Sequence, residues 1–159
     1  MPEKKSDYAN GHELVITRTF NAPRPLVWQV WTDPRHVTQW WGPRGFGNSS
    51  CEAALQVGGT FRLYLCAPDG NTYPCTGIFR EIVEPQRIVY DSTADESHPC
   101  GAGLPPRSLV TVTFAEHGDK TTLTLHTLFE NTTRKEAANR AGYSVSWGEA
   151  LERLSVQIR

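Results

Sequence analysis

Residues able to carry out chemistry are few in this sequence and lie far apart. A catalytic nucleophile needs a neighbouring base, and a metal ion needs several ligands at short, regular spacing. The GxSxG, HExxH, GxGxxG and P-loop patterns do not occur. We therefore expect no metal, no cofactor and no standard catalytic group. The histidines also lack ligand spacing: His12, His36, His98, His117 and His126.

The cysteines lack the CxxC spacing of a structural zinc site and occur as Cys51, Cys66, Cys75 and Cys100. We expect them to be reduced thiols. Cys66 and Cys75 flank the turn sequence CAPDGNTYPC, so a bridge across a hairpin stays open as an alternative.

Charged residues on the expected strands form a second group of candidates. Arg62, Arg80, Glu81 and Asp91 lie on or beside these strands. A charge inside an apolar cavity is costly unless it is paired, so pairing on a solvent-facing surface is the favoured interpretation. His126 alternates with apolar neighbours and should also face away from the core.

The aromatic side chains are candidates for ligand binding more than for catalysis. They can stack on a ring-bearing ligand or simply fill the core, and both interpretations stay open. Trp40 and Trp41 are adjacent at the end of an expected helix, so we predict that one faces inward while the other lines a pocket mouth or a partner surface. With aliphatic neighbours, the candidate ligand-binding residues are Trp31, Trp40, Trp41, Phe61, Leu63, Leu65, Ile78, Tyr90, Val112, Leu125, Tyr143 and Trp147.

A strand and two short helices come first among the elements that must position these side chains. Residues 14–20 alternate as a half-buried strand does. Pro23 suits the start of a helix, and Asp33-Pro34 is typical of an N-cap followed by a first-position proline. Gly42-Pro43 should end the second helix.

The middle of the chain has the period of two that indicates antiparallel strands. Asp69-Gly70 and His117-Gly118-Asp119 mark hairpin turns. Residues 91–107 are rich in Ser, Asp, Gly and Pro and predict a long surface loop. The expected strands cover residues 61–66, 76–82, 87–92, 109–114 and 122–129.

Helical spacing returns over residues 133–158 and predicts one long final helix. Gly142 and Gly148 interrupt it, at a propensity cost of roughly 1 kcal/mol each relative to alanine. The apolar stripe of this helix comprises Tyr143, Trp147, Ala150, Leu151 and Leu154.

Bulk properties exclude several classes of function. The chain has 159 residues, the size of one domain, and a formal charge of -1, without the basic excess that binding to a phosphate backbone requires. No apolar run approaches the roughly 20 residues that span a bilayer. We expect a polar tail over residues 1–12, a single domain over 13–159, a cytoplasmic location, no nucleic-acid partner and no membrane insertion.

These elements predict an α+β fold. A curved antiparallel sheet of about six or seven strands should wrap around a long C-terminal helix, with two short helices after the first strand. If sheet and helix do not touch along their whole length, an apolar cavity lies between them, and such cavities are the usual sites for small molecules.

Sequence segments in a characteristic order strengthen this prediction: ITRTFNAPRPLVWQVWTDP, WWGP, VGGTFRLYL, PDGNTYPCTGIFREIVEPQRIVY and GEALERL. Through them nearly the whole chain resembles the activator of heat-shock protein 90 ATPase homologue-like family, within the START-like or SRPBCC superfamily that includes the birch-pollen allergen. The resemblance implies a helix-grip fold with a hydrophobic cavity. Tyr143 stands where many relatives carry tryptophan, and Trp147 follows one helical turn later, so the aromatic cap of the cavity has moved.

The resemblance implies function only broadly. Our leading hypothesis is non-catalytic binding of a small hydrophobic or aromatic molecule in the cavity. One alternative is co-chaperone-like regulation of a heat-shock protein 90 partner, through the outer face of the sheet or the corner at residues 40–46. Another is an enzyme similar to polyketide cyclases, aromatases or hydrolases. A homodimer also stays open.

Overall fold

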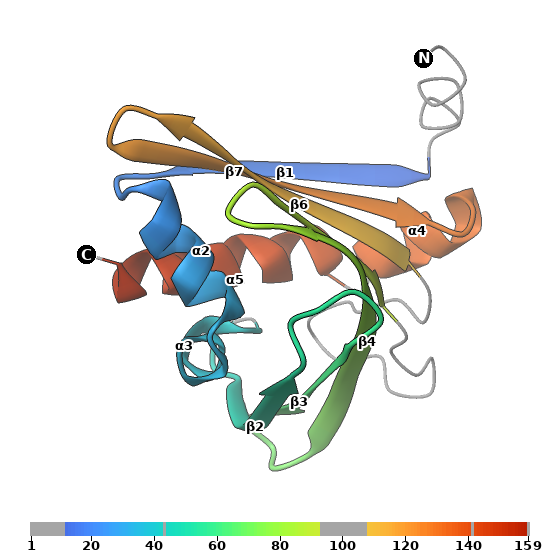
Figure 1. Ribbon diagram of the computed structural model, residues 1–159. Coiled ribbons are helices and arrows are strands. Elements are labelled where there is room, and N and C mark those ends of the chain that lie inside the picture. The colour runs from blue at the N-terminus through green and yellow to red at the C-terminus, as the bar shows by residue number, and fades with distance from the viewer. Residues whose placement is uncertain (1–11, 43, 93–107, 141, 159) are drawn as a thin grey trace.

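The computed structural model describes residues 12–42, 44–92, 108–140 and 142–158. Within them the chain forms four helices and a seven-stranded antiparallel sheet (Figure 1). The helices are α2 (Arg24–Thr32), α3 (Pro34–Trp40), α4 (Thr132–Arg140) and α5 (Tyr143–Gln157). The strands are β1 (Glu13–Phe20), β2 (Gly47–Ala53), β3 (Thr60–Cys66), β4 (Thr72–Val83), β5 (Arg87–Ser92), β6 (Ser108–His117) and β7 (Lys120–Phe129).

The sheet confirms the predicted α+β helix-grip architecture. Its strands follow the order β1-β7-β6-β5-β4-β3-β2, with every neighbouring pair antiparallel. The predicted hairpin turns contain Gly70 and Gly118, whose positive φ angles of 93° and 64° favour glycine. The sheet curves around α5, and α2 and α3 lie beside this helix at one end of the fold (Figure 1).

The corner between α2 and α3 forms as the sequence predicts. Pro23 is the N-cap of α2, and Asp33 is the N-cap of α3, with Pro34 at the first helical position. The Asp33 carboxylate accepts a hydrogen bond from the Arg35 backbone N-H at 2.9 Å, which satisfies a helix donor that has no intrahelical partner. The corner carries both helices against the concave face of the sheet.

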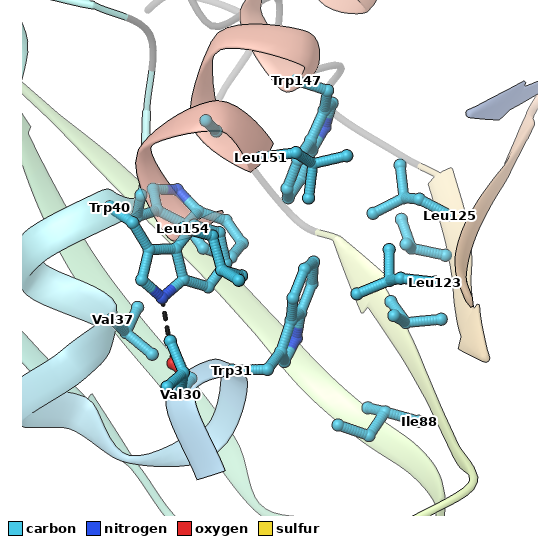
Figure 2. Close-up of a cluster of buried hydrophobic side chains, with 14 of the residues drawn as sticks. Val30, Trp31, Val37, Trp40, Ile88, Leu123, Leu125, Trp147, Leu151 and Leu154 are labelled. Atoms are coloured by element: carbon cyan, nitrogen blue, oxygen red, sulfur yellow. Dashed lines mark hydrogen bonds between the residues drawn. The ribbon is translucent and has the colours of Figure 1, made fainter. Parts of the chain in front are cut away.

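The tryptophan pair at the end of α3 contradicts the expectation that only one ring faces inward. Trp40 is fully buried, and Trp41 is only 6% exposed. Trp41 is the residue at which the chain leaves the helix, with φ -65° and ψ 133°, so its side chain also turns toward the core. The Trp40 indole N-H donates to the Val30 carbonyl oxygen at 2.9 Å, which satisfies an otherwise unpaired group at the end of α2 (Figure 2).

The prediction of a single long final helix is also wrong. The segment forms two helices, α4 and α5, and Gly142 lies between them with a left-handed φ of 96°. Glycine adopts this conformation without the steric cost that a Cβ imposes, so here it ends one helix and begins another. Gly148 remains inside α5, as predicted.

Strand β2 has no counterpart among the strands expected from the sequence. Its sequence, GNSSCEA, lacks alternating large apolar residues, and a register irregularity separates Asn48 from Cys51 in its pairing with β3. It pairs with β3 at the edge of the sheet, where a strand can form with fewer apolar side chains than in the centre.

Sheet register excludes the bridge between Cys66 and Cys75. Cys66 lies opposite Thr72, whereas the buried Cys75 lies opposite Leu63, so the two thiols are on different faces of the hairpin. Cys51, Cys66 and Cys75 are free thiols, as expected. Cys100 lies outside the described residues.

Two sequence predictions fall largely outside the described part of the chain. These are the polar tail, of which only His12 is described, and the surface loop, of which residues 93–107 are not described. Asp91 and Ser92, at the start of the predicted loop, belong to β5. Among the described residues, no helix has the length and apolar character needed to cross a bilayer, and no three His, Cys, Asp or Glu side chains gather in a way that could hold a metal ion.

Candidate ligand pocket

An apolar pocket opens at the end of the sheet formed by β2 to β5, against α2 and α3. Its volume is about 40 Å³. None of its lining residues comes from α5, so it differs from the cavity between sheet and C-terminal helix that the sequence predicts. The lining comprises Trp31, Thr32, Val37, Trp41, Cys51, Ala53, Leu55, Phe61, Leu63, Phe79, Ile88 and Tyr90.

Five of the twelve residues that line the pocket are aromatic. Trp41 lies between Trp31 and Phe61, with ring centroids 6.4 Å from each. Phe61 in turn meets Tyr90 edge-on at 5.0 Å and Phe79 at 5.4 Å. Such edge-on and tilted contacts are the arrangements that aromatic quadrupoles favour, and flat apolar molecules can form the same contacts.

The strand residues reach the pocket because they occupy alternate, inward-facing positions. Phe61 and Leu63 come from β3, and Ile88 and Tyr90 come from β5. Phe79 on β4 lies opposite Tyr90, immediately before a register irregularity at Arg80.

The loop between β2 and β3 forms the mouth of the pocket. Leu55 lines the pocket yet is 39% exposed, and Val57, two residues later, is 66% exposed. The loop is fixed to β4 by two backbone hydrogen bonds, from Gly58 N-H to the Phe79 carbonyl and from Phe79 N-H to the Gly59 carbonyl. The side chain of Leu55 can therefore move while the backbone of the loop stays attached.

Among the residues that the structure describes, no charged side chain lines the pocket. Burial, followed by the negative charges of Asp33 and Glu52, raises the pKa of the Cys51 thiol to about 11. Burial, followed by the proximity of Tyr143 and Cys75, raises the pKa of Tyr90 well above its ordinary value. Both groups are therefore neutral near pH 7, and neither supplies the anion that a nucleophilic mechanism needs.

The hydroxyl group of Thr32 is already satisfied. It donates to the Trp28 carbonyl oxygen one helical turn earlier, at 2.8 Å. The walls therefore offer a ligand almost only apolar surface.

The pocket is small in this conformation. A cavity of roughly 150 Å³ admits benzene, and the pocket provides about 40 Å³. A ring-bearing guest can therefore bind only if lining side chains move, and Leu55, with 39% of its surface exposed, is the least constrained of those named above.

The structure brings five of the twelve predicted site residues together at this pocket: Trp31, Trp41, Phe61, Leu63 and Tyr90. Ile78 faces the other way and lines a shallow groove on the outer face of the sheet. The remaining six are buried in the core and do not line the pocket: Trp40, Leu65, Val112, Leu125, Tyr143 and Trp147.

Several lining residues were missed by the sequence analysis. Alternation along β4 places Phe79 on the same face as Cys75 and Gly77, and this pattern can be seen in the sequence. Phe79 was missed because Ile78 and Ile82 make the opposite face look equally apolar. Cys51, Ala53 and Leu55 lie on β2 or just after it, in a segment without strand alternation. The other missed residues are Thr32, Val37 and Ile88.

The charged candidates pair on the outer face of the sheet, as predicted. Arg80 forms an ion pair with Asp91. Arg87 forms two hydrogen bonds with Glu81, at 2.8 and 3.0 Å. None of these groups lines the pocket.

Two further candidates, His126 and Arg62, also lie outside the pocket lining. His126 contacts the Glu13 carboxylate at the β1 edge of the sheet. Arg62 is exposed on β3, opposite Glu52.

A curved antiparallel sheet wrapped around a C-terminal helix, with an apolar pocket against two short helices, defines the helix-grip, START-like class of proteins. Within this class the chain belongs to the family described as Activator of Hsp90 ATPase homolog 1-like protein, which it matches over residues 21–158.

Solved structures share this fold at low sequence identity. A protein from Nitrosomonas europaea has a TM-score of 0.81 and 23% identity, over 91% of this chain and 92% of its own. One from Arthrobacter aurescens has a TM-score of 0.80 and 25% identity, over 91% and 84%. The AHSA1 protein of Silicibacter pomeroyi has a TM-score of 0.72 and 19% identity, over 91% and 96%. No functionally curated protein matches the sequence.

Proposed function

We propose that this protein binds a small, uncharged, ring-bearing molecule in the apolar pocket, without catalysis. The observation that carries the proposal is the lining itself, in which aromatic and aliphatic side chains surround a space that opens to solvent beside Leu55. Burial of apolar ligand surface contributes roughly 25 cal/mol per Å². Flat molecules match the rings of Trp31, Trp41 and Phe61 best.

The neutrality of the pocket supports an uncharged ligand. An ion moved into this lining would lose its hydration without gaining a partner of opposite charge, and that loss is costly. The same neutrality counts against the enzyme alternative, because Cys51 and Tyr90 hold their protons near pH 7. A binding role requires neither group to ionise.

The size of the pocket sets a condition on the proposal. A guest must displace side chains that now fill the space, and the free energy of this rearrangement reduces the affinity. We therefore expect compact molecules of two or three rings to bind with micromolar to sub-millimolar affinity and long-chain lipids to bind poorly.

Regulation of a protein partner is less well supported. Because Trp40 and Trp41 are both buried, neither tryptophan of the corner at residues 40–46 is the exposed anchor that the sequence suggested. The outer groove is lined by both charged and apolar residues, among them Glu52, Arg62 and Ile78. Neither surface favours a particular partner.

Titration with N-phenyl-1-naphthylamine, a neutral fluorescent probe, tests the proposed function. We expect a saturable rise in probe fluorescence for the natural sequence. Ala53→Leu adds three carbons to the wall of a pocket with about 40 Å³ of space and should weaken binding at least tenfold. Ala54→Leu is the matched control, because Ala54 is exposed and does not line the pocket. Equal binding by both variants would refute this site.

A further inference from the structure

Side chains on the concave face of the sheet form a row that connects the pocket to a cluster of hydroxyl groups. Strand register places Ala53, Phe61, Gly77, Ser92 and Ser108 directly beside one another on five adjacent strands. Residues opposite one another in antiparallel strands lie on the same face, with Cβ atoms about 5 Å apart. The row therefore runs from the apolar pocket to two buried serines.

The hydroxyl cluster has unused hydrogen-bonding capacity. Ser108 is 7% exposed, and its Oγ has no hydrogen-bond partner among the residues that the structure describes. Buried polar atoms are nearly always paired, so this unpaired hydroxyl is free to hydrogen-bond a bound group. Ser92, its neighbour across the β5-β6 pair, is 9% exposed.

A second pair of hydroxyls includes Thr127, which lies two residues along β7 from the position opposite Ser108. Thr127 Oγ1 and the Tyr143 hydroxyl lie 2.5 Å apart and share one hydrogen bond. The Tyr143 hydroxyl also accepts a hydrogen bond from the Trp147 side chain, and the pair keeps one O-H for a further partner. Phe129, which lies opposite Ser108, has its ring edge-on to Tyr143 at 5.4 Å, so one side chain is a neighbour of both Ser108 and Tyr143.

The ring of Phe61 lies between the pocket, which it lines, and Gly77 in the row. It lies over Gly77 so closely that a Cβ at that position would be 2.3 Å from ring atom Cε2. Gly77 is thus the one position in the row where a side chain is missing, and Phe61 fills the space. Movement of the Phe61 side chain would open the space over Gly77 to the pocket.

We propose that the ligand site continues past Gly77, and that Ser108 with the Thr127–Tyr143 pair binds one uncharged oxygen of the ligand. This inference rests on the proposed function and narrows its ligand class to flat apolar molecules with a neutral polar group at one end, such as phenols or ketones. An uncharged polar group suits this subsite because Ser92, Ser108, Thr127, Tyr143 and Phe129 carry no charge.

A matched pair of ligands tests this inference: naphthalene and 2-naphthol, each competing with N-phenyl-1-naphthylamine at pH 7. We expect Ser108→Ala to leave the affinity for naphthalene unchanged and to reduce the ratio of naphthol to naphthalene affinity about tenfold, the effect of one lost hydrogen bond. Tyr143→Phe should lower the ratio in the same direction. Ser50→Ala, at an exposed position on β2, is the control and should not change the ratio.

The outcomes separate this inference from the function on which it rests. An unchanged ratio in both Ser108→Ala and Tyr143→Phe, with naphthalene still bound, would overturn the polar subsite alone. Such a result would mean that Ser108 meets only solvent or an ordered water molecule. Failure of both ligands to bind the natural sequence would overturn the pocket and the subsite together.

Discussion

The indole rings of Trp31 and Trp147 are stacked, with their planes 6° apart and their centroids 5.8 Å apart (Figure 2). Trp31 lines the pocket from α2, whereas Trp147 comes from α5 and does not line it. The terminal helix therefore supports the pocket from behind. This contact links the stability of the helix-grip fold to the shape of the binding site.

Trp147→Ala should remove this support. Trp147 is 4% exposed, so its truncation leaves a cavity behind Trp31 and should lower the free energy of unfolding by about 3–5 kcal/mol. Urea denaturation followed by circular dichroism measures this change. Val145→Ala is the control on the same helix, because Val145 is 67% exposed and should cost less than about 0.5 kcal/mol. Similar values for the two variants would mean that the stack does not support the fold.

Two glycines near the C-terminus should respond to alanine in opposite directions. Gly148 lies inside α5, and a Cβ added there would meet nothing within 4 Å, so Gly148→Ala should stabilise the protein by roughly 1 kcal/mol. Gly142 has a φ of 96°, where a Cβ is strained, so Gly142→Ala should destabilise it by about 1–2 kcal/mol. Thermal unfolding of the two variants measures both effects. A lower melting temperature for Gly148→Ala would contradict the exposed position of this residue.

Cys51 should react slowly with alkylating reagents in the folded protein. A pKa of about 11, against an ordinary value of 9.0, reduces the thiolate fraction about 100-fold at pH 8. Peptide mass spectrometry after brief treatment with iodoacetamide measures the rate, and the urea-unfolded chain supplies the reference. Equal rates in the folded and unfolded protein would show that the thiol is not buried as described.

The raised pKa of the Cys51 thiol also predicts how the stability of the fold depends on pH. Because the folded-state pKa is raised, the folded protein holds the Cys51 proton more tightly than the unfolded chain does. The resulting stabilisation is complete below pH 9 and is lost as the pH rises toward about 11. Cys51→Ala should remove this component from the alkaline part of the stability profile.

The sequence predicted the order of elements well where local signals were strong. Alternation over β6 and β7, the glycine turns and the Asp33-Pro34 corner all led to the right elements, because hydrophobic period and capping act over a few residues. Strand β2 was missed because its pairing with β3, and not its own side chains, makes it a strand. The sequence predicted one continuous helix through Gly142, because the residue type alone does not reveal the left-handed backbone angle that separates α4 from α5.

The site was harder to predict than the fold. Trp41 shows one reason: its inward orientation depends on the backbone turning out of the helix at that residue. Ile78 shows another, since both faces of β4 carry apolar residues and only the register with β5 places Phe79 inside. The sequence identified the aromatic residues of the core, but the choice of those that border empty space depends on the packing of several elements at once.

Intermolecular nuclear Overhauser effects between bound naphthalene and the methyl groups of Val37, Leu55 and Leu63 test the central claim most directly. All three side chains line the pocket. We expect strong effects to these methyl groups in the natural sequence and in Ala54→Leu, and their loss in Ala53→Leu. Saturating naphthalene that gives no effect at these three residues, or effects only at Ile78 on the outer face, would contradict the proposal that this pocket binds ligands.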